Sequence, residues 1–322
     1  MKRTLCAIVV LCLRVYAATE SDSAIRQAEQ LRRQGRYADA QAALRTALGK
    51  LDRSSHAADR GNLLNSLGAV AQDRGSFAEA EQFYLQSIRT LEGAAGKQDL
   101  MVAAPLDNLG SLYLACGRLA ESETLRQRSL EIRIRALGPN HLDVARCLGN
   151  LALLAWRRDK YADAAARAEK ALAIYDTNGR HDTPEQAAIY MTLGLVAESQ
   201  RDFPMAGEHL HRALAIYEKA AGPESPLTIR PLVNLGTLDF LAGRPTAGEE
   251  DLRRALSLAE RVLGPTHRLV AEVLTNYAAA LRRSKRAREA KPLEKRARAI
   301  LKQHASDTVL RDSVDASLLA AN

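Results

Sequence analysis

One six-residue pattern decides the fold: Gly35-Arg36-Tyr37-Ala38-Asp39-Ala40, which returns along the chain at an almost constant interval. It recurs first as Gly75-Ser76-Phe77-Ala78-Glu79-Ala80 and next as Gly117-Arg118-Leu119-Ala120-Glu121-Ser122. Further copies are Tyr161-Ala162-Asp163-Ala164, Phe203-Pro204-Met205-Ala206 and the more degenerate stretches 245–248 and 287–290. Self-similarity with a period of about 42 residues is typical of repeat proteins, so we expect seven repeats over roughly residues 21–303.

Two positions of the repeat are restricted to small residues. The first lies twelve residues before the last residue of the pattern and holds Gly68, Gly110, Ala152, Gly194, Gly236 and Ala278. The second lies seven residues after it and holds Ala47, Ser87, Ser129, Ala171, Ala213, Ala255 and Ala297. Large apolar residues three apart, such as Leu106 and Leu109, share one helical face. Each repeat is therefore predicted to be two antiparallel helices, A and B, that approach closely at the small residues.

The predicted helix ends recur in the same register. Helix B is expected to end at a glycine, and a proline follows in three repeats. These glycines are Gly96, Gly138, Gly222 and Gly264. The next helix A is expected to begin after an N-cap residue at one shared position, which holds Asp99, His141, Thr183, Ser225 and His267. Thr183 and Gln186 fit a capping box, and the N-cap position accounts for two of the seven histidines without chemistry.

Composition excludes several classes of protein. The chain has 322 residues and a net charge of +8, and the segment 282–302, with ten Lys or Arg and two Glu, carries +8 by itself. Four cysteines without a Cys-x-x-Cys pair exclude a disulfide-framed mini-protein and this type of metal site. The sequence has no glycine-rich phosphate loop, no Gly-x-Ser-x-Gly turn and no His-Glu-x-x-His helix. We therefore expect no enzyme, no cofactor and no bound metal.

Residues 1–17 have the order of a secretory signal peptide. Lys2 and Arg3 precede an apolar run over residues 5–13, and the small residues Val15 and Ala17 fit a cleavage site. The run is about half the roughly 20 apolar residues that a membrane-spanning helix needs. Export to the periplasm or the exterior is the expected location, with no membrane-spanning segment after removal of the signal. The alternative is an amphipathic first helix of a cytoplasmic protein.

The spacing of small residues, twelve and then seven, with a large apolar residue four before the first, resembles the tetratricopeptide repeat. The links Leu137-Gly138-Pro139-Asn140-His141 and Leu263-Gly264-Pro265-Thr266-His267 are similar to those of the kinesin-light-chain type. The resemblance implies an all-α, right-handed superhelical solenoid of about seven antiparallel helix pairs over residues 18–303. Its repeats would lie near 21–50, 57–96, 99–138, 141–180, 183–222, 225–264 and 267–303, before a capping or flexible tail over 304–322. The heptad coiled coil of kinesin light chains is missing, so motor association does not carry over.

A polar position directly precedes a core residue of helix A in six repeats. Its residues are Ser66, Asn108, Asn150, Thr192, Asn234 and Asn276. The resemblance implies that this position faces the concave side, where asparagine holds the backbone of a bound peptide. The alternative is that each asparagine only hydrogen-bonds the adjacent repeat. We therefore expect a non-catalytic interaction scaffold with a peptide-binding groove at Asn108, Asn150, Asn234 and Asn276.

Basic residues at other predicted inner positions suggest an acidic protein or peptide partner. These are Arg146, Arg157, Arg230, Arg282 and Arg283. The planar guanidinium is suited to a carboxylate. The groove prediction includes Arg146 and Arg230 for this reason, although scattered solvated charge is the better explanation for any single one of these arginines.

The basic run over 282–302 provides a different function as an alternative. It could bind nucleic acid, an acidic lipid or another polyanion. It has no interleaved aromatic residue for base stacking, so nucleic acid is not the expected partner and a polar capping unit is the preferred interpretation. Trp156, the only tryptophan, is interpreted as packing rather than as a contact for a partner.

The first prediction concerns the N-terminus. If residues 1–17 are a cleaved signal, N-terminal sequencing of the exported protein will begin at Ala18 or close to it, because Val15 and Ala17 occupy the −3 and −1 positions of the cleavage site. An intact Met1 on protein recovered from the soluble cytosolic fraction would contradict it.

Overall fold

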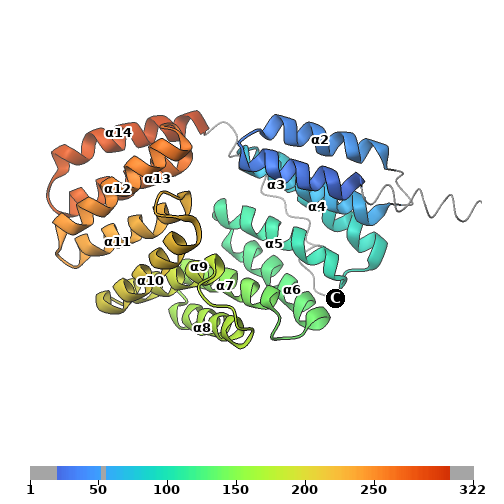
Figure 1. Cartoon of the computed structure of the whole chain (residues 1–322), viewed down its shortest axis with the longest axis horizontal. Coiled ribbons are helices and arrows are strands. Elements are labelled where there is room, and N and C mark those ends of the chain that lie inside the picture. Colours follow the sequence, from blue (N-terminus) through green and yellow to red (C-terminus); the bar gives the residue numbers. More distant parts are fainter. Residues whose placement is uncertain (1–19, 52–55, 305–322) are drawn as a thin grey trace, which may run out of the picture. The chain divides into compact units, whose positions relative to one another are not determined.

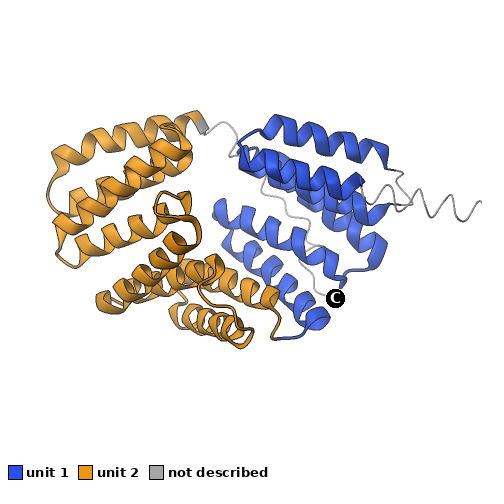
Figure 2. Cartoon of the chain, in the orientation of Figure 1, with its two compact units in different colours: residues 1–139, 307–322 blue, residues 140–306 orange. Residues whose placement is uncertain are grey.

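The computed structural model describes residues 20–51 and 56–304, so the predicted signal peptide and the tail over 305–322 lie outside the described residues. Every helix and turn in these ranges belongs to an all-α repeat fold, and they contain no strand. The described residues divide into two compact units, unit 1 up to Pro139 and unit 2 from Asn140 onward (Figure 2). Each unit is a short solenoid of antiparallel helix pairs, so the prediction of an all-α repeat solenoid is confirmed.

Unit 1 begins with a helix over residues 20–33, which is followed by five further helices (Figure 1). These are α2 (Tyr37–Lys50), α3 (Ala57–Asp73), α4 (Phe77–Ala95), α5 (Leu100–Ala115) and α6 (Leu119–Leu137). Within each pair the two helices pack against each other, as α3 does on α4 and α5 on α6. The core of the unit lies between the helices and includes the fully buried side chains of Tyr84 and Tyr113.

Unit 2 contains four such pairs and one short 3₁₀ turn. The first two pairs are α7 (Leu142–Arg157) with α8 (Tyr161–Thr177), and α9 (Pro184–Ser199) with α10 (Phe203–Ala221). The turn η1 (Pro226–Thr228) leads into α11 (Ile229–Leu241) and α12 (Pro245–Leu263), and the last pair is α13 (Arg268–Arg283) with α14 (Ala287–His304). Odd-numbered helices of the unit are A helices and even-numbered ones are B helices.

The glycines of the first small position are required by contact with helix B of the same repeat. A Cβ atom built on Gly236 would lie 2.7 Å from Leu252 and 2.8 Å from the carbonyl oxygen of Gly248. One built on Gly194 would lie 2.7 Å from Leu210. Protein interiors are close-packed, so neither α10 nor α12 can move aside freely to make room for the added methyl group. The small residue therefore sets the distance between the two helices.

The second small position lies on helix B and is buried in every repeat. Ala171, Ala213 and Ala255 are completely buried. Where a serine stands instead, its hydroxyl bonds to the backbone of helix A: Ser87 Oγ donates to the carbonyl of Gly61 at 2.7 Å, and Ser129 Oγ to that of Ala103 at 2.9 Å. A buried hydroxyl must find such a partner.

Most predicted helix ends are confirmed, but the prediction at Ser225 is wrong: Ser225 caps the short 3₁₀ turn η1, and α11 begins only at Ile229. The Asp99 side chain accepts a hydrogen bond from the backbone N–H of Met101 at 2.8 Å, and Thr183 with Gln186 forms a complete capping box. His141 and His267 are also N-caps, since the Nδ1 atom of each accepts the N–H two residues later at 3.1 Å. All four predicted C-terminal glycines have a positive φ, between 84° and 95°.

Substitution of two helical glycines provides a matched test of the close approach. Gly236→Ala should lower the free energy of unfolding by about 1–3 kcal/mol, because the new methyl group overpacks the contact with α12. Gly207→Ala should raise it by about 0.5–1 kcal/mol, because its Cβ would meet only Leu238 at 3.7 Å and alanine favours the helix. Urea denaturation followed by circular dichroism measures both. Equal effects would show that the A–B distance is not set at Gly236.

Candidate functional site

The polar position of helix A lines a cavity in both units. In unit 1, Ser66 and Asn108 lie in a cavity of about 240 Å³. In unit 2, Asn150 and Thr192 line a cavity of about 330 Å³ that also contains Tyr175 and Tyr217, here called the tyrosine cavity. Asn234 and Asn276 line a cavity of about 440 Å³ that contains Trp156, here called the tryptophan cavity. The two predicted arginines lie there too, Arg146 in the tyrosine cavity and Arg230 in the tryptophan cavity.

The four predicted asparagines differ in their hydrogen bonds. Asn108 Nδ2 donates to Oδ1 of Asn65, in the preceding repeat, at 2.9 Å. Asn276 Nδ2 donates to the carbonyl of Glu272 on its own helix at 2.9 Å. The side-chain amides of Asn150 and Asn234 form no hydrogen bond with any residue in the described ranges. The alternative of bonding between repeats therefore applies to Asn108, whereas Asn150 and Asn234 have amides available to a ligand.

The predicted arginines have acidic partners within the chain. Arg146 Nη2 lies 2.6 Å from a carboxylate oxygen of Asp143, and Arg230 Nη2 lies 3.3 Å from one of Glu272. Both pairs are solvent-exposed and are worth little individually. Arg157, in the tryptophan cavity, makes no ion pair with the described residues. No carboxylate of the described residues therefore offsets its charge in the tryptophan cavity.

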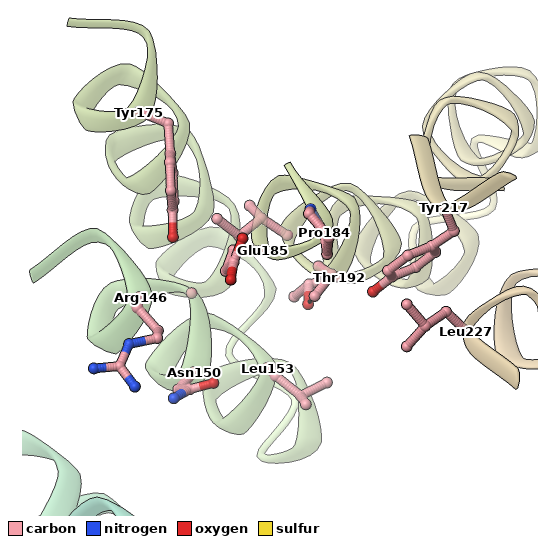
Figure 3. A pocket seen from close by; sticks show the side chains of 12 residues that line it. Arg146, Asn150, Leu153, Tyr175, Pro184, Glu185, Thr192, Tyr217 and Leu227 are labelled. Atoms are coloured by element: carbon pink, nitrogen blue, oxygen red, sulfur yellow. Dashed lines mark hydrogen bonds between the residues drawn. The ribbon is translucent and has the colours of Figure 1, made fainter. Parts of the chain in front are cut away.

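Two tyrosines that the sequence interpretation missed form walls of the tyrosine cavity. Tyr175 near the end of α8 and Tyr217 near the end of α10 are only 4% and 7% exposed. Figure 3 shows both hydroxyls directed toward the cavity, with Glu185 and Thr192 between them. Neither hydroxyl forms a hydrogen bond with a residue that the structure describes. Two hydroxyls on largely buried tyrosines therefore face the cavity without a hydrogen-bond partner among the described residues.

The phenols stay protonated at neutral pH. Burial raises the pKa of Tyr175 to about 12, and the negative charge of Glu185 acts in the same direction. Burial also raises the pKa of Tyr217, again with a contribution from Glu185. Each hydroxyl can consequently donate one hydrogen bond and accept others.

A signal for these residues exists in the sequence, but it is incomplete. Tyr175 and Tyr217 occupy the same position of helix B in successive repeats. That position is not aromatic in the other repeats, for example Arg133 and Ala259, so the repeat alone does not single it out. Glu185 lies in the first turn of α9, next to the capping residues Thr183 and Gln186, so the sequence suggests only a role at the helix end.

The tryptophan cavity is lined mainly by apolar side chains. Leu153, Met191 and Leu195 line this cavity. Trp156 Nε1 donates to the carbonyl of Leu195 at 3.2 Å and to Ser199 Oγ at 3.0 Å, so the indole joins α7 to α9. Leu153 lines both cavities of unit 2, which are therefore neighbours on the A-helix surface.

The basic run over 282–302 lies on the end of α13 and on α14. Four of its ten cations form ion pairs. The pairs are Arg282–Glu294, Arg286–Glu249, Arg296–Glu260 and Arg298–Glu294. Arg286 and Arg296 each reach a glutamate of the preceding repeat, and the hydrogen bond from Arg286 lowers the pKa of Glu249 to about 2. Part of the basic run therefore forms ion pairs between the last repeat and the repeat before it.

Metal ligation and membrane insertion were further possibilities for residues 20–51 and 56–304. They hold no cluster of three or more His, Cys, Asp or Glu side chains arranged to bind a metal ion. None of their helices combines the length and the apolar character needed to cross a bilayer. Cys116 and Cys147, the cysteines within these ranges, are not joined in a disulfide.

Comparison with known families gives one consistent match. A family model described as tetratricopeptide repeat matches residues 101–177, 185–247 and 232–303, and a second model with the same description matches residues 61–99. Among curated proteins, no sequence matches the chain.

Several solved structures share the fold. BtubC (BKLC) from P. vanneervenii is 23% identical over 77% of this chain and 92% of its own, with a TM-score of 0.53. A putative kinesin light chain from Podosopora anserina is 19% identical over 65% of this chain and 98% of its own, with a TM-score of 0.51. The Rap conjugation gene regulator of plasmid pLS20, solved with the Phr* peptide, is 12% identical over 92% and 99%, with a TM-score of 0.61. At these identities the similarity concerns the fold.

Because Asn108 forms a hydrogen bond between repeats and Asn234 forms none, replacing each of them should change the free energy of unfolding by different amounts. Asn108→Ala should lower the free energy of unfolding by about 0.5–1.5 kcal/mol, because it removes the bond to Asn65. Asn234→Ala should leave it unchanged or slightly raised, because no bond is lost and alanine favours the helix. Thermal and urea denaturation of both variants measure the difference. A clear loss of stability in Asn234→Ala would show that this amide has a structural partner.

Proposed function

The chain belongs to the tetratricopeptide repeat family, in its kinesin-light-chain-like type, and from this premise we propose that it is a non-catalytic scaffold that binds a segment of another protein. Repeat folds of this kind generally act in protein–protein interaction rather than in catalysis. The proposed binding surface is the A-helix face of unit 2, where the tyrosine and tryptophan cavities meet at Leu153.

The observation that carries the proposal is the pair of available amides in these cavities. A bound extended segment loses water from its backbone N–H and C=O groups, so each needs a new partner. The amides of Asn150 and Asn234 offer two donors and an acceptor each. Beside them, Met191, Leu195 and Val233 provide an apolar lining of the tryptophan cavity against which a partner side chain can be buried.

A structural relative supports this type of ligand. The Rap conjugation gene regulator was solved in complex with the Phr* peptide, and another Rap protein in complex with the competence and sporulation factor. The similarity is one of fold, so it supports a peptide or protein segment as the ligand without indicating its sequence.

An acidic residue in the partner remains part of the proposal, and the ion pairs of the chain favour one place for it. Arg146 and Arg230 would have to leave Asp143 and Glu272 before binding a carboxylate. Arg157 has no such ion pair to exchange. We therefore assign the acidic contact to Arg157, at the tryptophan cavity. We further propose that the complex forms outside the cytoplasm. The basis for this proposal is only the signal-like sequence of residues 1–17.

A polyanion is the second candidate ligand, because six cations of the basic run make no ion pair with the described residues. They are Arg283, Lys285, Arg288, Lys291, Lys295 and Lys302. Binding through them would weaken steeply as salt rises, since it releases counterions. Groove binding would depend on the asparagines and much less on salt.

The double variant Asn234→Ala/Asn276→Ala tests the groove, because both side chains line one cavity. Loss of two hydrogen bonds of about 0.5–1.5 kcal/mol each predicts roughly ten-fold weaker binding at unchanged helix content. The partner is first identified by pull-down from the exported fraction, and the full chain is then titrated with it at two salt concentrations.

Asn140→Ala is the matched control, because Asn140 lies in the loop before α7 and lines none of these cavities. It should bind as the wild type does. If the double variant binds as tightly as the wild type and binding weakens steeply with salt, the partner binds at the basic run over 282–302 and not in the groove.

A further inference from the structure

Glu185 is an exposed carboxylate in the tyrosine cavity without an ion pair. It is the second residue of α9, and no cation of the described residues lies within 4 Å of its oxygens. Elsewhere on this surface the acidic side chains Asp143 and Glu272 are each paired with an arginine. The cavity thus combines an accessible negative charge with the two unpartnered tyrosine hydroxyls described above.

We propose that the tyrosine cavity binds a positively charged side chain, arginine or lysine, of the segment held in the groove. The inference rests on the proposed function, because the side chain belongs to the segment bound in the groove. It adds to that function a preference for a positively charged residue. The acceptors are the Glu185 carboxylate and the phenol oxygens of Tyr175 and Tyr217, with Oδ1 of Asn150 on the same lining.

These groups match what a cationic side chain requires. A guanidinium has five N–H donors and an ammonium three, and neither has an acceptor. Hydrogen bonds between such a cation and a carboxylate are about twice as strong as neutral ones. Leu153, Pro184 and Leu227 can cover its aliphatic stem. The cavity of about 330 Å³ gives room for one such side chain.

Two neighbouring arginines could compete with this ligand, and their positions differ. Arg146 lines the same cavity, but Asp143 offsets its charge, and in Figure 3 its guanidinium is turned away from Glu185. Arg180 lines an adjoining cavity together with Tyr175 and Glu185 and forms no ion pair with the described residues. Arg180 is therefore the group whose charge opposes a cation here, and its removal should favour binding.

Short capped peptides test the preference without knowledge of the partner. The full chain, labelled with 3-fluorotyrosine, is titrated with the acetylated and amidated tripeptides Ala-Arg-Ala, Ala-Lys-Ala, Ala-Gln-Ala and Ala-Glu-Ala. Fluorine NMR follows the Tyr175 and Tyr217 signals, which are assigned from the Tyr175→Phe and Tyr217→Phe variants. The arginine and lysine peptides should shift both signals in a saturable manner, and the glutamine and glutamate peptides should not.

Three variants with conserved shape identify the charge that is responsible. Glu185→Gln should weaken binding of the arginine peptide at least ten-fold, and Arg180→Gln should strengthen it two- to five-fold. Glu169→Gln is the matched control, because Glu169 is an exposed residue of α8 that lines none of these cavities, and it should change nothing.

The opposite pattern would overturn the inference. Equal shifts with the glutamine peptide, or unchanged binding in Glu185→Gln, would show that the cavity does not select charge. Binding of the glutamate peptide that is lost in Arg180→Gln would show an anion site instead. The proposed function fails separately, if the partner binds the Asn234→Ala/Asn276→Ala variant as tightly as the wild type.

Discussion

The close approach of helix A to helix B is the constraint on which the rest of the structure depends. At Gly236 the backbone of α11 lies so near α12 that a single methyl group would collide with a carbonyl oxygen. The contact recurs at Gly194 against Leu210, in the equivalent place of the repeat before. Because side-chain packing is dense, this distance fixes how each pair of helices fits together and hence which residues of helix A remain uncovered. The polar position follows from that geometry, since it lies on the uncovered side.

Many charged side chains of this protein pair with one another. Arg286 and Arg296 bind glutamates of the preceding repeat, and Arg146 and Arg230 bind acidic residues of A helices. Ion pairs on an exposed surface stabilise little, but they remove the net charge that a ligand would otherwise meet. Recognition of a charged partner therefore depends on the few charged side chains that form no ion pair within the described residues. In unit 2 these include Arg157 and Glu185, one in each cavity, which have opposite signs.

The repeats also explain why the tyrosine cavity and the tryptophan cavity differ in character. Equivalent positions carry different side chains, so each gap between neighbouring A helices has its own lining. Tyr175 and Tyr217 place phenols around the tyrosine cavity, whereas the tryptophan cavity combines Trp156 and Met191 with polar side chains such as Asn234. A shared fold thus supplies a common surface, whereas ligand preference arises from the residues that are not repeated.

The sequence by itself determined the repeat, the helix pairs, their caps and the small contact positions, because these depend on local spacing and on interactions that recur once in every repeat. It also placed the asparagines on one helix face, since that too is a matter of periodicity. Only the tertiary structure decided that Asn108 bonds Asn65 while Asn150 and Asn234 stay available, and that Arg230 is already paired with Glu272. Hydrogen bonds and ion pairs between repeats depend on short distances between side chains that lie a whole repeat apart in the sequence. A pattern in one chain does not contain those distances, and the same holds for the burial of Tyr175 and Tyr217 around Glu185.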